Sequence, residues 1–125
     1  RLWVGNGARK LVRRAVLHVT GLTEAELDVD LWQAAHQGFL HHYALVASRH
    51  TCVYPHVIET LAYLQRAGVR MAVITNKPGQ FTPQLLEVLG LADFFELVVC
   101  GDTLPVQKPD PAPLLHVMQC FGLEA

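Results

Sequence analysis

Two short segments carry groups suited to binding a phosphate: VITNK at residues 73–77 and KPDP at residues 108–111. Thr75 directly follows a short apolar run that is typical of a buried parallel strand. Ligands of open α/β sheets bind at the carboxyl ends of the strands, so the Thr75 hydroxyl and the backbone N–H groups after it can donate to phosphoryl oxygens. Lys108, on a short loop stiffened by Pro109, supplies a positive charge with a fixed direction.

Each of these residues also has a purely structural interpretation. A strand-end hydroxyl such as that of Thr75 can bond to local backbone, Asn76 can simply shape the turn, and Lys77 and Lys108 can be solvated loop lysines. The pattern as a whole favours a phosphate contact for Thr75 and a catalytic role for Lys108. It leaves Asn76 open between a turn residue and a substrate contact, and it favours the solvated interpretation for Lys77.

Asp28 and Asp30 form a closely spaced pair of carboxylates, which could in principle be catalytic. The residues before the pair do not form a strand, because Thr23 and Glu26 make the pattern of a helix capping box. We therefore interpret Asp30 as the N-cap of a helix. The histidines are scattered, and His36, His41 and His42 lie on a predicted helix, which favours packing over metal binding.

The chain divides into two differently patterned parts. Residues 1 to about 50 show only helical spacing, with predicted helices after Asn6, after Thr23 and from Asp30 to Ser48. From residue 54 onward helices and strands alternate, over residues 57–64, 69–74, 82–89, 97–100 and 111–121. This alternation predicts an α/β fold with a partial Rossmann-like parallel sheet over residues 51–125, preceded by a helical domain over residues 1–50.

Composition excludes several classes of protein. Of the 125 residues 51% are hydrophobic, and the formal net charge of −1 gives no general attraction to nucleic acid or to a membrane surface. No apolar run approaches the length of a membrane span, about 20 residues. The three cysteines are widely spaced, which fits neither a disulfide framework nor a zinc site. We expect a cytoplasmic protein in a reducing compartment, acting on a small molecule as a monomer or dimer.

The order of the motifs resembles the haloacid dehalogenase superfamily, and within it the phosphoglycolate phosphatase type. The resemblance covers nearly the whole chain, from the segment WVGNG at residues 3–7 onward. Its main part is carried by the segments PHV (55–57), AGV (67–69), ITNKP (74–78), LGL (89–91), GDTLP (101–105) and KPDPAPL (108–114).

The resemblance implies an enzyme that hydrolyses a small phosphate monoester, 2-phosphoglycolate above all, through an aspartyl-phosphate intermediate and with Mg²⁺ as cofactor. It implies that Thr75 and Lys108 are catalytic and that Thr75 and Asn76 bind the substrate. The helical domain corresponds to this family's cap. Backbone donors at Gly5 and Asn6 then either meet the carboxylate of the substrate or form only a cap turn.

The sequence departs from the family pattern in two places. The family's D-x-D-G-T segment, which holds the nucleophile, has no counterpart, and Gly101-Asp102 is not the G-D-x-x-x-D metal loop, because Val106 stands where an acid is required. We therefore expect an internal fragment, inactive alone, that contributes no metal ligand and whose Mg²⁺ ligands lie outside it. Two alternatives are another haloacid dehalogenase-like phosphatase or pyrophosphatase and a catalytically incomplete cap-and-half-core module.

Overall fold

The computed structural model describes residues 7–124, so the sites predicted at Gly5 and Asn6 lie outside the described residues. The chain forms two compact units, Arg1–Val46 and Ala47–Ala125. Each unit has its own architecture, the first helical and the second a mixture of helices and parallel strands. The predicted α/β fold class is confirmed.

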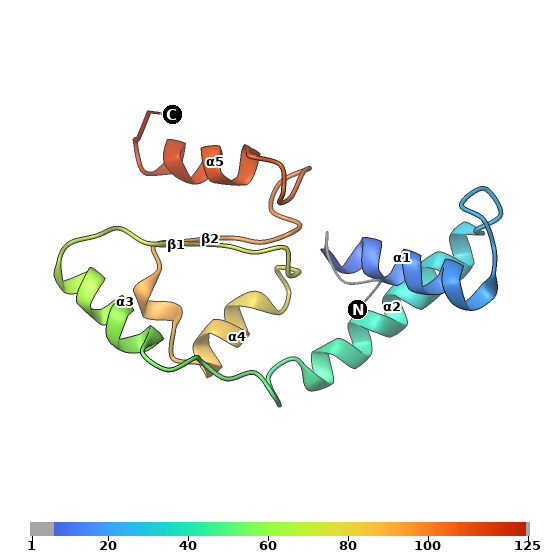
Figure 1. The fold of residues 1–125 in the computed structure, drawn as a ribbon, viewed down its shortest axis with the longest axis horizontal. Helices are drawn as coiled ribbons and strands as arrows, with labels where there is room; N and C mark the ends of the chain where they lie inside the picture. The colour runs from blue at the N-terminus through green and yellow to red at the C-terminus, as the bar shows by residue number, and fades with distance from the viewer. Residues whose placement is uncertain (1–6, 125) are drawn as a thin grey trace. The chain divides into compact units, whose positions relative to one another are not determined.

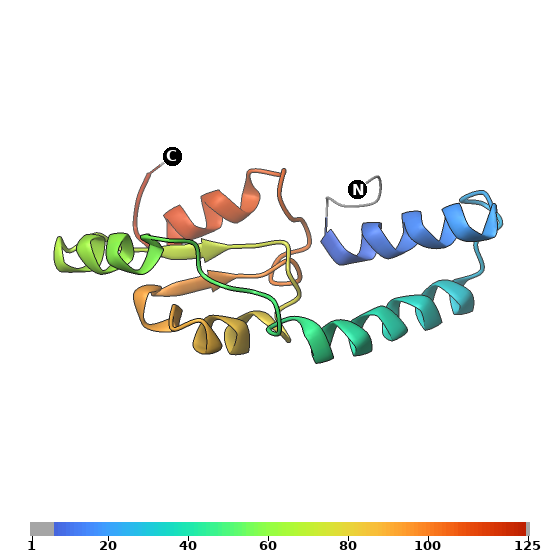
Figure 2. The ribbon, with the colours of Figure 1, turned by 60° about the horizontal axis from the view of Figure 1, so that its bottom comes forward.

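Within its described residues, 7–46, the first unit contains two helices that lie side by side (Figures 1 and 2). Helix α1 spans Gly7–Thr20 and helix α2 spans Val29–Val46. The predicted end of α1 is confirmed: Gly21 adopts a φ of 71°, which glycine tolerates, and its N–H donates to the Leu17 carbonyl over 2.9 Å.

A cation–π contact joins α1 to α2. The guanidinium carbon of Arg9 lies 5.0 Å from the centre of the Trp32 ring. Trp32 also stacks on His36 of the same helix, whose ring centroid is 5.1 Å away with an interplanar angle of 9°. Burial first, and then the charge of Arg9, lowers the pKa of His36, so its imidazole is neutral at pH 7. His36 is therefore placed as a packing residue, as predicted.

The predicted helix after Thr23 is wrong, and so is the N-cap at Asp30. Glu26 accepts hydrogen bonds from the backbone N–H and hydroxyl of Thr23, at 2.9 and 2.7 Å, yet these bonds close only a turn. The true cap of α2 is Asp28, whose Oδ2 accepts the Leu31 N–H over 3.1 Å. Because α2 starts at Val29, the turn has no room to grow into a helix, and a single turn does not repay the cost of helix nucleation.

The second unit is built on two short parallel strands. Strand β1 spans Ala72–Ile74 and strand β2 spans Leu97–Val99, and the register aligns Val73 with Val98. Helix α5 contacts both strands, and Figures 1 and 2 show it on the opposite side of the sheet from α4. The sequence predicted these strands from their apolar runs, which are typical of strands enclosed between helices.

Three α-helices and one 3₁₀ turn surround these strands: α3 (Val57–Arg66), α4 (Thr82–Val88), η1 (Ala92–Phe94) and α5 (Ala112–Cys120). The sequence did not predict η1, because a single 3₁₀ turn is too short to show a periodic pattern. Helix α5 begins one residue later than expected. Asp110 still acts at its start, since its Oδ1 accepts the Ala112 N–H over 2.8 Å.

The core of the second unit lies between the sheet and its helices. Val99 is the most buried of its large side chains, with 1% exposed, and Leu85, Cys100 and Val117 are also buried. The polar Thr82 is tolerated there because its hydroxyl donates to the Pro78 carbonyl over 3.0 Å. None of the helices in the described part of the chain combines the length and apolar character needed to cross a membrane.

Backbone strain is localised at His56, the residue before α3. Its φ of 65° lies in the left-handed region, where a side chain costs about 1 kcal/mol or more. We expect His56→Gly to raise the midpoint of urea unfolding of a full-length protein that contains this chain, because glycine removes this cost and only the exposed His56–Glu59 pair is lost. His56→Ala is the control, because it loses the same pair but keeps the strain. Equal midpoints for both variants would contradict the prediction.

Candidate functional site

The carboxyl ends of β1 and β2 lie at one edge of the sheet, where Thr75 follows β1. The Thr75 N–H donates to the Val99 carbonyl over 2.9 Å, which extends the sheet pairing by one residue. The Thr75 hydroxyl accepts the Lys77 N–H over 3.1 Å. This bond occupies a lone pair of the hydroxyl oxygen, so the hydroxyl hydrogen can be donated to a ligand.

Lys108 reaches the same edge from a distant part of the chain. Its Nζ donates to the carbonyl of Ile74, the last residue of β1, over 2.6 Å. An ammonium group has three donors, so two remain for a ligand. The structure thus brings Lys108 to the strand end that carries Thr75, with Lys108 exposed and Thr75 half-buried.

The side chain of Asn76 points to the Lys108 loop. Its Nδ2 donates to the Lys108 carbonyl over 2.8 Å. Its Oδ1 is buried and has no hydrogen-bond partner among residues 7–124. The sequence left Asn76 open between a turn residue and a substrate contact, and the observed bond gives it a third role, as a link between two loops.

The loop after β2 braces the loop after β1. The Gly101 N–H donates to the Lys77 carbonyl and the Gly79 N–H donates to Asp102 Oδ1, both over 2.8 Å. Any side chain at Gly101 is excluded, because its Cβ would lie 2.5 Å from the Asn76 carbonyl oxygen. Sequence reasoning missed this role, since it considered Gly101-Asp102 only as a metal loop. A glycine directly after a buried strand was the signal for close backbone approach.

The described residues by themselves do not fit a Mg²⁺ ion. No three His, Cys, Asp or Glu side chains within residues 7–124 gather in a way that could hold a metal. Mg²⁺ takes oxygen ligands in near-octahedral geometry. At this edge the carboxylate of Asp102 already accepts the Gly79 N–H.

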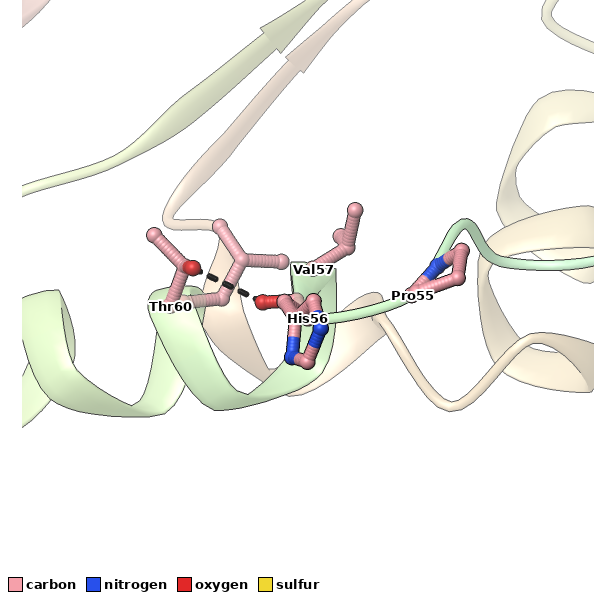
Figure 3. Close-up of a pocket in the computed structure, with 5 residues that line it drawn as sticks. Pro55, His56, Val57 and Thr60 are labelled. Atoms are coloured by element: carbon pink, nitrogen blue, oxygen red, sulfur yellow. Dashed lines mark hydrogen bonds between the residues drawn. The ribbon is translucent and has the colours of Figure 1, made fainter.

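A separate hollow of about 220 Å³ lies at the start of α3 (Figure 3). It is lined by Pro55, His56, Val57, Thr60 and Leu61. The Thr60 hydroxyl in its wall donates to the His56 carbonyl over 2.7 Å and is therefore already engaged. None of Thr75, Asn76 and Lys108 lines this hollow, and its lining supplies no fixed cation for a phosphate.

The second unit is an α/β structure whose parallel sheet presents a hydroxyl and an ammonium at one strand end, donors of the kind that suit an anion. Comparison with protein families identifies the family to which the chain belongs. Residues 8–125 match the haloacid dehalogenase-like hydrolase family, and the chain belongs to that family.

Two phosphoglycolate phosphatases are similar to the chain in sequence. The chain is 47% identical over 123 residues to a phosphoglycolate phosphatase of Nitrosococcus oceani, covering 98% of this chain and 53% of the relative. It is 47% identical over 127 residues to phosphoglycolate phosphatase 1 of Pseudomonas aeruginosa, covering 99% of this chain and 44% of the relative. The chain therefore spans about half the length of these relatives.

The fold is also similar to part of a solved structure. The crystal structure of a predicted phosphoglycolate phosphatase from Haemophilus somnus 129PT superposes with a TM-score of 0.85 at 36% identity. The match covers 97% of this chain and 54% of the solved chain. Both units of the present chain thus have counterparts in one solved chain.

Proposed function

We propose that the protein acts as a phosphatase on a small phosphate monoester. The observation that carries the proposal is the meeting of Thr75 and Lys108 at the carboxyl end of β1, with the Lys108 ammonium 2.6 Å from the Ile74 carbonyl. The hydroxyl donates to one phosphoryl oxygen, and the ammonium balances the negative charge of the group being transferred. Membership of the haloacid dehalogenase-like hydrolase family supports this chemistry.

The proposed reaction has two steps. An aspartate oxygen from outside the described residues attacks phosphorus, the ester P–O bond breaks, and a second aspartate, also from outside them, gives its proton to the leaving alcohol. The second aspartate then takes a proton from water, which attacks phosphorus; the bond between phosphorus and the first aspartate breaks, and inorganic phosphate and the free carboxylate are released. We also propose Mg²⁺ as the cofactor, with ligands from outside the described residues; membership of the family is its support.

The proposed substrate is 2-phosphoglycolate. Its support is the name that the relatives from Nitrosococcus oceani and Pseudomonas aeruginosa share. We propose that the helical first unit serves as a cap that selects the leaving group, with Gly5 and Asn6 meeting the substrate carboxylate. We propose a monomer or dimer without nucleic-acid or membrane partners. Free thiols at Cys52, Cys100 and Cys120 support a reducing, cytoplasmic setting.

The test uses a hybrid enzyme, in which this chain replaces the matching segment of the Nitrosococcus oceani phosphatase. We expect it to release phosphate from 2-phosphoglycolate faster than from other small phosphate monoesters, and to release no halide from 2-haloacids. Thr75→Val should lower kcat/KM by about tenfold or more, because one donor to the phosphoryl group is lost. Thr75→Ser, which keeps the hydroxyl, should retain most of it.

Two outcomes would contradict the proposal. One is a hybrid enzyme that releases halide, or that prefers another ester. The other is equal activity of the valine and serine variants. The 125-residue chain alone, assayed in parallel with Mg²⁺ and 2-phosphoglycolate, is expected to be inactive, because its sequence lacks the family's nucleophile and metal-loop motifs and Asp28 serves as the cap of α2. Turnover by the chain that is lost on mutating Asp28 would overturn the interpretation of that residue as a cap.

A further inference from the structure

Asn76 and Lys108 hold each other in a reciprocal arrangement. The Asn76 side chain donates to the backbone carbonyl of Lys108 over 2.8 Å. In return, the Lys108 side chain donates to the backbone carbonyl of Ile74, two residues before Asn76, over 2.6 Å. Together the two bonds tie the Lys108 backbone to the end of β1, to which the Lys108 ammonium also bonds.

The orientation of the Asn76 amide is fixed. A half-turn of the amide would place Oδ1 against the Lys108 carbonyl, which sets two acceptors face to face. The Asn76 backbone is also confined, because even a Cβ at Gly101 would lie 2.5 Å from its carbonyl oxygen. Since Oδ1 is buried, the amide has no accessible oxygen to offer a ligand.

We propose that Asn76 is a positioning residue for Lys108 and does not contact the substrate. The lysine side chain has four rotatable bonds, so the ammonium keeps its place only if the backbone that carries it is held. Asn76 supplies that restraint from the opposite loop. The inference deepens the proposed phosphatase function and rests on it for the role of Lys108.

The reaction is sensitive to such positioning. A displacement of a charged group by about 1 Å can cost up to a hundredfold in rate. Loss of the Asn76 bond loosens the Lys108 loop without removing the ammonium, so the expected cost is smaller than that of losing Lys108 itself. It should appear in kcat, where the charge acts, and not in KM.

A double-mutant cycle in the hybrid enzyme tests the proposal. We expect Asn76→Ala to lower kcat by about tenfold with KM nearly unchanged, and to have almost no further effect once Lys108 is alanine. Asn76→Asp, which has the same size but no donor, should lose at least as much. Gln84→Ala removes an exposed amide from α4 and serves as the matched control, with no expected change.

Two outcomes would overturn the proposal. Equal losses from Asn76→Ala in both backgrounds would mean that Asn76 acts independently of Lys108. A rise in KM at constant kcat would identify a substrate contact.

Hydrogen exchange of the hybrid enzyme provides a second readout that does not need activity. Asn76→Ala should accelerate exchange of the Asp110 amide, which donates to Gln107 across the Lys108 loop over 3.0 Å, and should leave the Thr75 amide in the sheet unchanged. Unchanged exchange at Asp110 would contradict the link. If the unmutated hybrid has no phosphatase activity, the proposed function fails, while this measurement still decides whether Asn76 restrains the loop.

Discussion

Replacing Lys108 by alanine in the hybrid enzyme is expected to lower kcat for 2-phosphoglycolate by about a hundredfold or more, the usual cost of removing one preorganised charge contact. The Nζ of Lys108 is held 2.6 Å from the Ile74 carbonyl, at the strand end that also carries Thr75. Two of its three donors remain for the phosphoryl group and for the attacking carboxylate. KM should change less than kcat, because the charge matters most in the transition state.

Lys77→Ala is the matched control for this prediction. Lys77 is also an exposed lysine beside Thr75, but the site uses its backbone: its N–H donates to the Thr75 hydroxyl and its carbonyl accepts the Gly101 N–H. Alanine preserves both bonds, so kcat should change little. Equal losses at Lys77 and Lys108 would contradict the assignment of the catalytic charge to Lys108.

The sheet, and the order of its strands along the chain, were predictable because local sequence patterns mark each strand. The apolar runs at β1 and β2 lie between helical patterns, and a parallel pair is the simplest solution for such an alternation. The misses lie where two local signals compete. At the start of α2, Asp28 and Asp30 are both cap-type residues; the sequence analysis chose Asp30, but Asp28 caps the helix, and the capping box at Thr23 has no room for a helix of its own.

The site was predictable as far as it depends on single residues that follow strands. Thr75 was singled out because it follows a strand and Lys108 because prolines stiffen its loop, and the structure brings both to one edge; their roles stay predictions. The direction of the Asn76 amide was not predictable, because its acceptor is a backbone carbonyl 32 positions away in the chain. The contact of Gly101 with the backbone of Asn76 also depends on loop geometry that no periodic pattern encodes.

The second unit exposes surfaces that sheets of this type normally cover. In the described residues the sheet has two strands, so one edge of β1 has no hydrogen-bonded neighbour. Apolar side chains of the second unit are also exposed, with Val69 at 47%, Leu114 at 55% and Leu115 at 46%. Parallel strands are usually buried on both faces, and an open edge invites pairing with another chain.

We therefore expect the isolated chain to be marginally stable, with the second unit molten or self-associated and the helices of the first unit partly formed. The amides of Thr75 and Glu96, which donate to Val99 and Met71, should exchange quickly in the isolated chain and slowly in the hybrid enzyme, where further strands can cover the edge. The Trp32 amide in α2, which donates to Asp28, is the internal comparison and should differ less between the two proteins. Slow exchange at Thr75 and Glu96 in a monodisperse isolated chain, with one cooperative melting transition, would show that the two strands and their helices are stable without further pairing.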